Sequence, residues 1–155
     1  MNPAFALLDK LLVITNTVGE FLPQLGLRLL LAYEFWESGV EKFRGENWFA
    51  DIQDKFPFPF DLVPVDVSWQ LSTWSELLGS VALVIGLGTR FFSVSLVILT
   101  LVAWASVHAG HGYNVCQNGF KLPLIYLIMF LPLVFSGPGK LSVDQWLWNK
   151  FGKTV

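Results

Sequence analysis

The sequence predicts an all-α integral membrane protein: a bundle of four transmembrane helices with an N-terminal helix at the membrane interface. Of the 155 residues, 54% are hydrophobic and 14% are charged, whereas soluble domains average about 25% charged residues. The mean hydropathy is +0.55. Apolar segments close to 20 residues long recur along the chain, and about 20 helical residues cross the hydrocarbon of a bilayer. The predicted spans are 24–43, 68–88, 91–109 and 120–136.

The N-terminal segment is predicted to lie on the membrane surface. Phe5, Leu8 and Leu12 recur at helical spacing, but Asp9 and Lys10 interrupt the apolar run. This pattern favours an interfacial helix over one that crosses the bilayer. No basic region precedes the apolar run, so a cleaved signal peptide is not expected.

The first span has an unusual number of charged residues for a membrane helix. It carries Arg28, Glu34, Glu37, Glu41 and Lys42. A charge at bilayer depth costs roughly 2.5–3.5 kcal/mol on insertion scales, so these side chains need partners, water or a function. Glu41 and Lys42 lie near the wet end of the helix, and Arg28 is close enough to the other end to extend toward the headgroups. Glu34 and Glu37 lie further from either end and are the stronger candidates for a buried polar core.

Residues 44–67 form the one long extramembrane loop. The loop is acidic, and its centre reads FPFPF at residues 56–60. Alternating prolines favour extended backbone and exclude helix. The aromatic side chains are expected to rest at the membrane surface beside Trp48 and Phe49. A plain interfacial lid is favoured over a loop that grips a ligand.

The second span combines a row of small residues with one acid. Ser75, Gly79, Ala82 and Gly86 share a helix face, and Glu76 lies beside that row. Small residues let two membrane helices approach closely. A lone acid beside such a face is expected to meet a cation from a neighbouring helix, and Arg28 and Lys42 are the two candidates. The predicted polar core therefore comprises Arg28, Glu34, Glu37, Lys42 and Glu76.

The loop between the third and fourth spans contains the candidate soft ligands. His108, His111 and Cys116 fall within ten residues of one another, and imidazole and thiolate ligands suit copper or zinc. The signal is weak, because such residues often occur together by chance. A b-type haem is less favoured, since haem ligands usually come from opposite helices. The fourth span ends at a Gly-Pro-Gly-Lys turn, and residues 137–155 form a C-terminal tail.

Charge and cysteine content exclude some classes of function and favour one orientation in the membrane. A net charge of −2 gives no basic patch for nucleic acid. The single cysteine, Cys116, cannot form a disulfide within the chain. The chain is expected to form one membrane domain, residues 1–155, that crosses a bacterial-type inner membrane several times. The distribution of lysine and arginine favours cytoplasmic termini by a narrow margin.

Several of these residues together resemble the DoxX family of small membrane proteins. They are Arg28, Gly39 and Lys42, then Glu76 and Gly79, and finally Gly86-x-Gly88-Thr-Arg90 with the closing Gly137–Asp144 segment. Residues 107–124 are most similar to the HvfX-type branch, which is associated with copper-binding modified peptides. The resemblance implies a four-helix inner-membrane protein, often linked to redox or quinone partners, without established catalytic residues.

Two functional hypotheses follow from the sequence, and neither settles whether the chain is an enzyme. The first is a partner-dependent component of a redox or copper-peptide system, with the polar core inside the bundle and the His/Cys loop at its outer mouth. The alternative is a quinone-reactive oxidoreductase subunit, whose polar core lines a quinone site. Quinone and copper are thus the cofactors to consider, and a protein partner or homo-oligomer is expected in the bilayer. A small exporter is a third candidate, although four spans would need to oligomerise to form a pathway.

Overall fold

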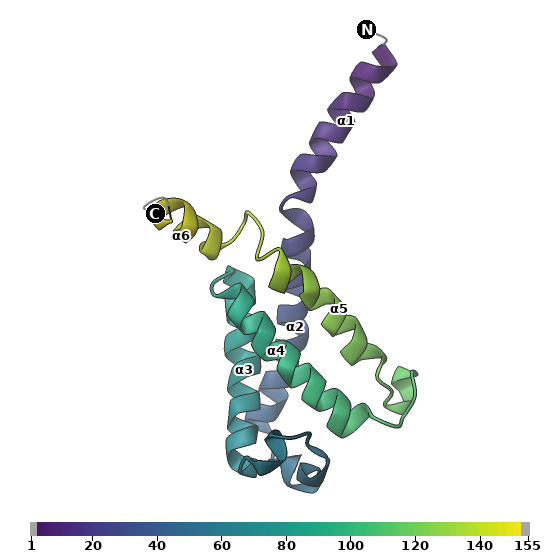
Figure 1. The fold of residues 1–155 in the computed structure, drawn as a ribbon, viewed down its shortest axis with the longest axis vertical. Helices are drawn as coiled ribbons and strands as arrows, with labels where there is room; N and C mark the ends of the chain where they lie inside the picture. Colours follow the sequence, from purple (N-terminus) through teal and green to yellow (C-terminus); the bar gives the residue numbers. More distant parts are fainter. Residues whose placement is uncertain (1–2, 153–155) are drawn as a thin grey trace.

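The computed structural model describes residues 3–152 and is entirely helical over them. Figure 1 shows the α-helices in chain order. Their bounds are α1 (Pro3–Gly19), α2 (Leu22–Arg44), α3 (Val65–Ile85), α4 (Thr89–Ala103), α5 (Lys121–Phe135) and α6 (Val143–Phe151). Short 3₁₀ turns lie in the α2–α3 and α4–α5 connections.

Helices α2 to α5 pack around one apolar core. α2 lies along α3, α3 packs against α4, α4 packs against α5, and α5 also contacts α2. Leu31, Leu83, Leu96, Phe130 and Leu133 are completely buried at the centre. Successive helices run in opposite directions, so the 45–64 segment and the turn after α4 lie at one end of the molecule, away from both termini (Figure 1).

The outer faces of these helices are strongly apolar. Exposed leucine, valine, isoleucine and aromatic side chains occur on each of α2, α3, α4 and α5. By length and composition, one described helix is suited to cross a membrane, the 20-residue stretch Thr89–His108 with mean hydropathy 1.9. Lys121–Phe135 is apolar but shorter. α2 differs because its charged side chains, among them Glu34 and Glu37, interrupt the apolar sequence.

α1 projects away from the other helices as an extension of α2 (Figure 1). Its side chains from Leu7 to Val18 are exposed, including the apolar ones. The hydroxyls of Thr15 and Thr17 donate to the carbonyls of Leu11 and Val13, each 2.8 Å away. The polar threonines are thus satisfied within the helix itself.

The 45–64 segment is more compact than the sequence indicates. It forms three short 3₁₀ helices, η1 (Trp48–Asp51), η2 (Gln53–Lys55) and η3 (Phe60–Leu62). Phe49 and Phe56 are buried against Trp69 of α3, with ring centroids 5.3 Å apart between the two phenylalanines. These two rings therefore form a small core of their own instead of resting on the membrane surface, since burial against Trp69 removes more apolar area from water.

The third predicted span, 91–109, is not a single α-helix. α4 ends at Ala103 and continues as a π-helical turn, η4 (Trp104–His108). The Trp104 ring stacks on Phe120 with an interplanar angle of 9° and centroids 5.0 Å apart, which ties this turn to the start of α5. π-helical turns widen a helix locally and occur often at functional sites.

Candidate functional site

Arg28 lies at the end of the bundle near the termini and binds backbone carbonyls. Its side chain is 1% exposed. Nε donates to the Leu83 carbonyl at 2.7 Å and Nη2 donates to Val84 at 2.7 Å, both in the last turn of α3. Nη1 donates to Leu141 at 2.6 Å and Pro138 at 3.2 Å. The last carbonyls of a helix have no partner within it, and Arg28 supplies partners for two of them.

The turn between α3 and α4 completes this arrangement, which we call the Arg28 cluster (Arg28, residues 86–89 and residues 138–144). Gly86 has φ +71°, and a Cβ there would lie 2.6 Å from Ser142 Cβ, so only glycine fits. The Asp144 carboxylate accepts hydrogen bonds from the backbone N–H groups of Gly88 and Thr89 at 2.7 and 2.9 Å. Asp144 thereby caps the N-terminus of α4 and joins the first turn of α6 to the bundle.

Arg28 is therefore not the partner of Glu76, and the predicted polar core divides into two separate parts. Arg28 and Lys42 are both on α2, but 14 residues of helix separate them by about 21 Å at 1.5 Å per residue. Of the two candidate cations, Lys42 is the one that reaches Glu76.

Lys42 and Glu76 form an ion pair near the opposite end of α2. Lys42 Nζ lies 2.9 Å from each carboxylate oxygen of Glu76 and donates to Ser38 Oγ at 2.7 Å. Glu76 is 2% exposed. Gly39 makes this approach feasible, because a Cβ there would lie 3.1 Å from Glu76 Cβ. A buried ion pair is tolerated only when its remaining hydrogen bonds are satisfied, as Ser38 helps to do.

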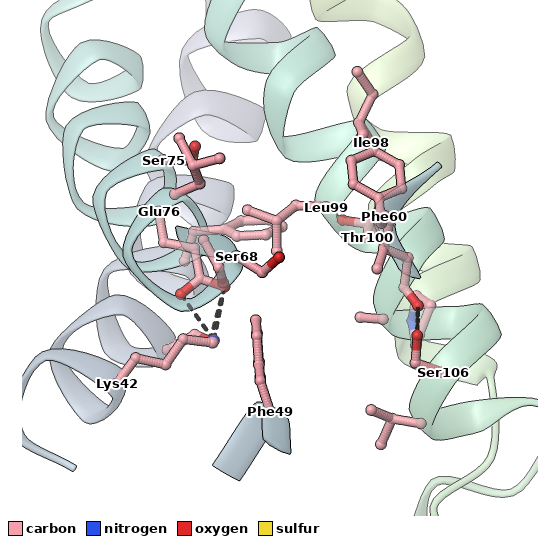
Figure 2. A pocket seen from close by; sticks show the side chains of 18 of the residues that line it. Lys42, Phe49, Phe60, Ser68, Ser75, Glu76, Ile98, Leu99, Thr100 and Ser106 are labelled. Atoms are coloured by element: carbon pink, nitrogen blue, oxygen red, sulfur yellow. Dashed lines mark hydrogen bonds and ion pairs between the residues drawn. The ribbon is translucent and has the colours of Figure 1, made fainter. Parts of the chain in front are cut away.

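The ion pair lies on the wall of a pocket of about 610 Å³ between α2, α3, α4 and α5. The turns η1 to η3 close one side, through Phe49, Phe56 and Phe60. Figure 2 shows Lys42 and Glu76 on one side of the pocket, with Thr100 and Ser106 on the other. The rest of the wall is mainly apolar, with further serines: Ile52, Val63, Leu71, Ile98, Leu99, Val102, Leu122, Ser68, Ser75 and Ser95.

Ser72 is the buried polar group of this wall that has no partner. It is 5% exposed, and Oγ makes no hydrogen bond in the part of the chain that the structure describes. Some other buried hydroxyls of the bundle donate to the carbonyl four residues earlier, as Thr100 does at 2.7 Å. The hydroxyls of Thr89 and Ser93 are also buried without a partner among the described residues, but they do not line this pocket. An unpaired buried hydroxyl costs about 1–3 kcal/mol, and on the wall of a pocket the Ser72 hydroxyl is available to a ligand that would satisfy it.

Glu34 and Glu37 also line the pocket, in different ways. Glu34 is half-buried and accepts a hydrogen bond from the Tyr126 hydroxyl of α5. Glu37 is exposed. A pocket of this kind has polar groups at a few fixed points on apolar walls, which suits an amphipathic ring compound of moderate size.

The His108, His111 and Cys116 side chains are not gathered into a metal site. His108 lines the pocket, and its Nδ1 bonds to the Asn118 carbonyl at 2.8 Å. His111 and Cys116 are exposed on the following turns. Over residues 3–152, no group of three or more His, Cys, Asp or Glu side chains is placed to hold a metal ion. The three residues are close in sequence, but the chain between His108 and Cys116 turns at Gly110 and Gly112, which have φ +87° and +70°.

Three residues of these sites were not anticipated from the sequence. Ser72 looks like any small helix residue, and Tyr126 belongs to an otherwise apolar span. Asp144 lies in the tail, and its cap on α4 is a contact 55 residues away in sequence. Only Asp144 carried a signal, because it ends one of the segments that resemble the DoxX pattern.

Comparison with known proteins identifies the family of this chain and two relatives. The DoxX family profile matches residues 24–109, from the start of α2 to the end of η4. A protein of Haemophilus influenzae, described only as uncharacterized, is 54% identical, covering 82% of this chain and 84% of its own. A second uncharacterized protein of the same organism is 31% identical, covering 82% and 89%. No solved structure matches significantly. The chain therefore belongs to the DoxX family of membrane proteins.

Proposed function

We propose that this protein is a multi-pass inner-membrane component of a redox system, which works with a protein partner and binds a quinone in the pocket between α2 and α5. The observation that carries the proposal is the unpartnered Ser72 hydroxyl on the wall of a mainly apolar pocket that has polar groups at a few points. The pocket also lies within the range of about 300–1,000 Å³ that small-molecule sites occupy.

The proposed membrane arrangement has α2, α3, α4 with η4, and α5 as four spans. Exposed apolar side chains on all four helices support it, because monomeric soluble proteins rarely expose so much contiguous apolar surface. The two cations of α2 that lie within the bundle have partners, since Arg28 binds backbone carbonyls and Lys42 pairs with Glu76. In this arrangement both termini are cytoplasmic, and the pocket and the 110–119 turns lie toward the outer face.

Labelling of Cys116 tests this orientation. Cys116 is exposed on the turn between η4 and α5, and it is the only cysteine in the chain. A membrane-impermeant maleimide is expected to label it in intact spheroplasts, as fully as it does after lysis. Labelling that requires lysis would reverse the proposed orientation.

A quinone fits the chemistry of the pocket. Its ring and isoprenoid tail are apolar, as are most of the lining side chains, and its ring oxygens are hydrogen-bonding groups. Lys42 donates hydrogen bonds to both carboxylate oxygens of Glu76, so the pair provides a fixed local dipole and not a free charge. Ser72 supplies the hydrogen bond to the ring.

A partner is required because the chain has little redox chemistry of its own. A single cysteine cannot cycle between dithiol and disulfide within one chain. In the proposal this chain binds the quinone, and a second protein supplies or removes the electrons.

A role with copper-binding peptides is the second candidate. The similarity of residues 107–124 to the HvfX-type branch suggests it, and the exposure of His111 and Cys116 is the structural observation in its favour. The quinone role has stronger support, because the pocket is assembled from the described residues and the metal ligands are not.

One experiment separates the two candidates. The protein is purified in mild detergent, its lipids are extracted and its metals are measured by elemental analysis. The quinone role predicts a quinone in the extract at close to one molecule per chain, and no stoichiometric copper. Copper without quinone would support the peptide role and contradict the quinone role.

A further inference from the structure

The hydrogen bond of His108 determines which of its ring nitrogens carries a proton. Nδ1 lies 2.8 Å from the Asn118 carbonyl oxygen. A carbonyl oxygen only accepts hydrogen bonds, so Nδ1 carries the hydrogen and donates it. In the neutral imidazole, Nε2 then has a lone pair and no hydrogen. Nε2 can therefore accept a hydrogen bond from a ligand but cannot donate one.

The surrounding structure holds His108 at the pocket. It is the last residue of the π-helical turn η4, which the stacking of Trp104 on Phe120 ties to α5. Asn118 has φ +60°, and its amide Nδ2 lies 3.5 Å from the Val107 carbonyl. The two segments are thus linked in both directions, and His108 is half-buried in the pocket wall as a result.

Two other polar groups of the pocket, Lys42 and Ser72, have less selective chemistry. Lys42 Nζ is already engaged by Ser38 Oγ and both oxygens of Glu76. The Ser72 hydroxyl can donate or accept, so it suits any oxygen of a ring. His108 Nε2 requires a donor on the ligand. The carboxylates of Glu34, Glu37 and Glu41, which also line the pocket, are acceptors too, and Glu34 already accepts from Tyr126.

We propose that the pocket selects the reduced, hydroxyl-bearing form of its ligand, with a ring hydroxyl of a hydroquinone donating to His108 Nε2. This inference rests on the proposed quinone function and adds the redox state that the site prefers. A quinone offers only acceptor oxygens, so its oxygen would face the lone pair of Nε2 without a hydrogen between them. One unmade hydrogen bond in a buried site changes affinity by about tenfold.

The test compares three probes of nearly equal size: decylubiquinone, its hydroquinone and the dimethyl ether of that hydroquinone. Binding to the full-length protein in detergent is measured by anaerobic equilibrium dialysis at pH 8, with a reductant present for the hydroquinone. The variants are His108→Phe and, as the matched control on the neighbouring exposed turn, His111→Phe.

We expect the unmodified protein and His111→Phe to bind the hydroquinone about tenfold more tightly than the other two probes. His108→Phe is expected to bind all three within about twofold of one another. Equal affinities in the unmodified protein, or a preference that survives in His108→Phe, would overturn the inference while leaving quinone binding intact. Failure of all three probes to bind the unmodified protein would remove the proposed function as well. The dimethyl ether comparison needs no variant, so the inference stays testable if His108→Phe does not fold.

Discussion

Replacement of Arg28 by methionine is expected to lower the free energy of unfolding by more than about 3 kcal/mol. The guanidinium donates to four backbone carbonyls and is 1% exposed. Each charge-assisted hydrogen bond contributes about 1.5–3 kcal/mol, and methionine would leave the carbonyls of Leu83 and Val84 without partners. Arg28→Lys is expected to recover part of the loss, because an ammonium cannot reproduce the planar fork of the guanidinium.

The measurement is denaturation by SDS in mixed micelles, with Arg44→Met as the control. Arg44 is at the exposed C-terminal end of the same helix, and this change should stay within about 0.5 kcal/mol of the unmodified protein. A similar small loss for Arg28→Met would show that the Arg28 cluster does not hold α3, α4 and the tail together.

Removing one partner of the Lys42–Glu76 pair is expected to lower the free energy of unfolding by about as much as Arg28→Met. Glu76→Ala leaves the Lys42 ammonium buried without its partner, and such a change costs about 3–5 kcal/mol. Removing both partners removes the stranded charge, so the Lys42→Ala, Glu76→Ala double variant should be less destabilised than the sum of the two single variants. The expected coupling is at least about 1.5 kcal/mol.

Two comparisons make this result specific. The exposed pair between Lys140 and Glu20 should show a coupling of about 0–1 kcal/mol in the same assay. Glu76→Ala combined with Arg28→Ala should be additive, because Arg28 has no contact with the pair. Additive losses for Lys42 and Glu76, or coupling between Glu76 and Arg28, would contradict the described pairing.

The sequence identified the charged residues of α2 as candidates for a buried polar core, but it did not show that Arg28 and Lys42 belong to two separate sites. Charges in an apolar helix are costly wherever they occur, so composition alone singled out Arg28 and Lys42 together. Their partners depend on the antiparallel register of α2 and α3, which places the last turn of α3 at Arg28 and Glu76 near Lys42. Helical spacing within one segment carries no information about that register.

The pocket could not be predicted from the sequence, for a similar reason. Its walls come from four helices and the 45–64 segment, and its key hydroxyl, Ser72, is defined by a hydrogen bond that it does not make. The sequence also suggested surface aromatics where Phe49 and Phe56 are buried against Trp69. Aromatic content shows that a loop has apolar area to bury, but not whether lipid or protein will cover it.

Ser72 provides the most direct test of the claim that the pocket is a binding site. Because its hydroxyl has no partner in the described protein, Ser72→Ala should not lower the free energy of unfolding of the unliganded protein, and removal of the unpaired group is expected to raise it by about 1–3 kcal/mol. It should nevertheless weaken decylubiquinone binding by about tenfold, since the ring oxygen loses its hydrogen bond. Ser80→Ala is the matched control, because Ser80 is also buried on α3, donates to the Glu76 carbonyl at 2.6 Å and does not line the pocket. Its affinity for decylubiquinone should not change. Equal affinity in the unmodified protein and Ser72→Ala would contradict the assignment of this pocket as the quinone site.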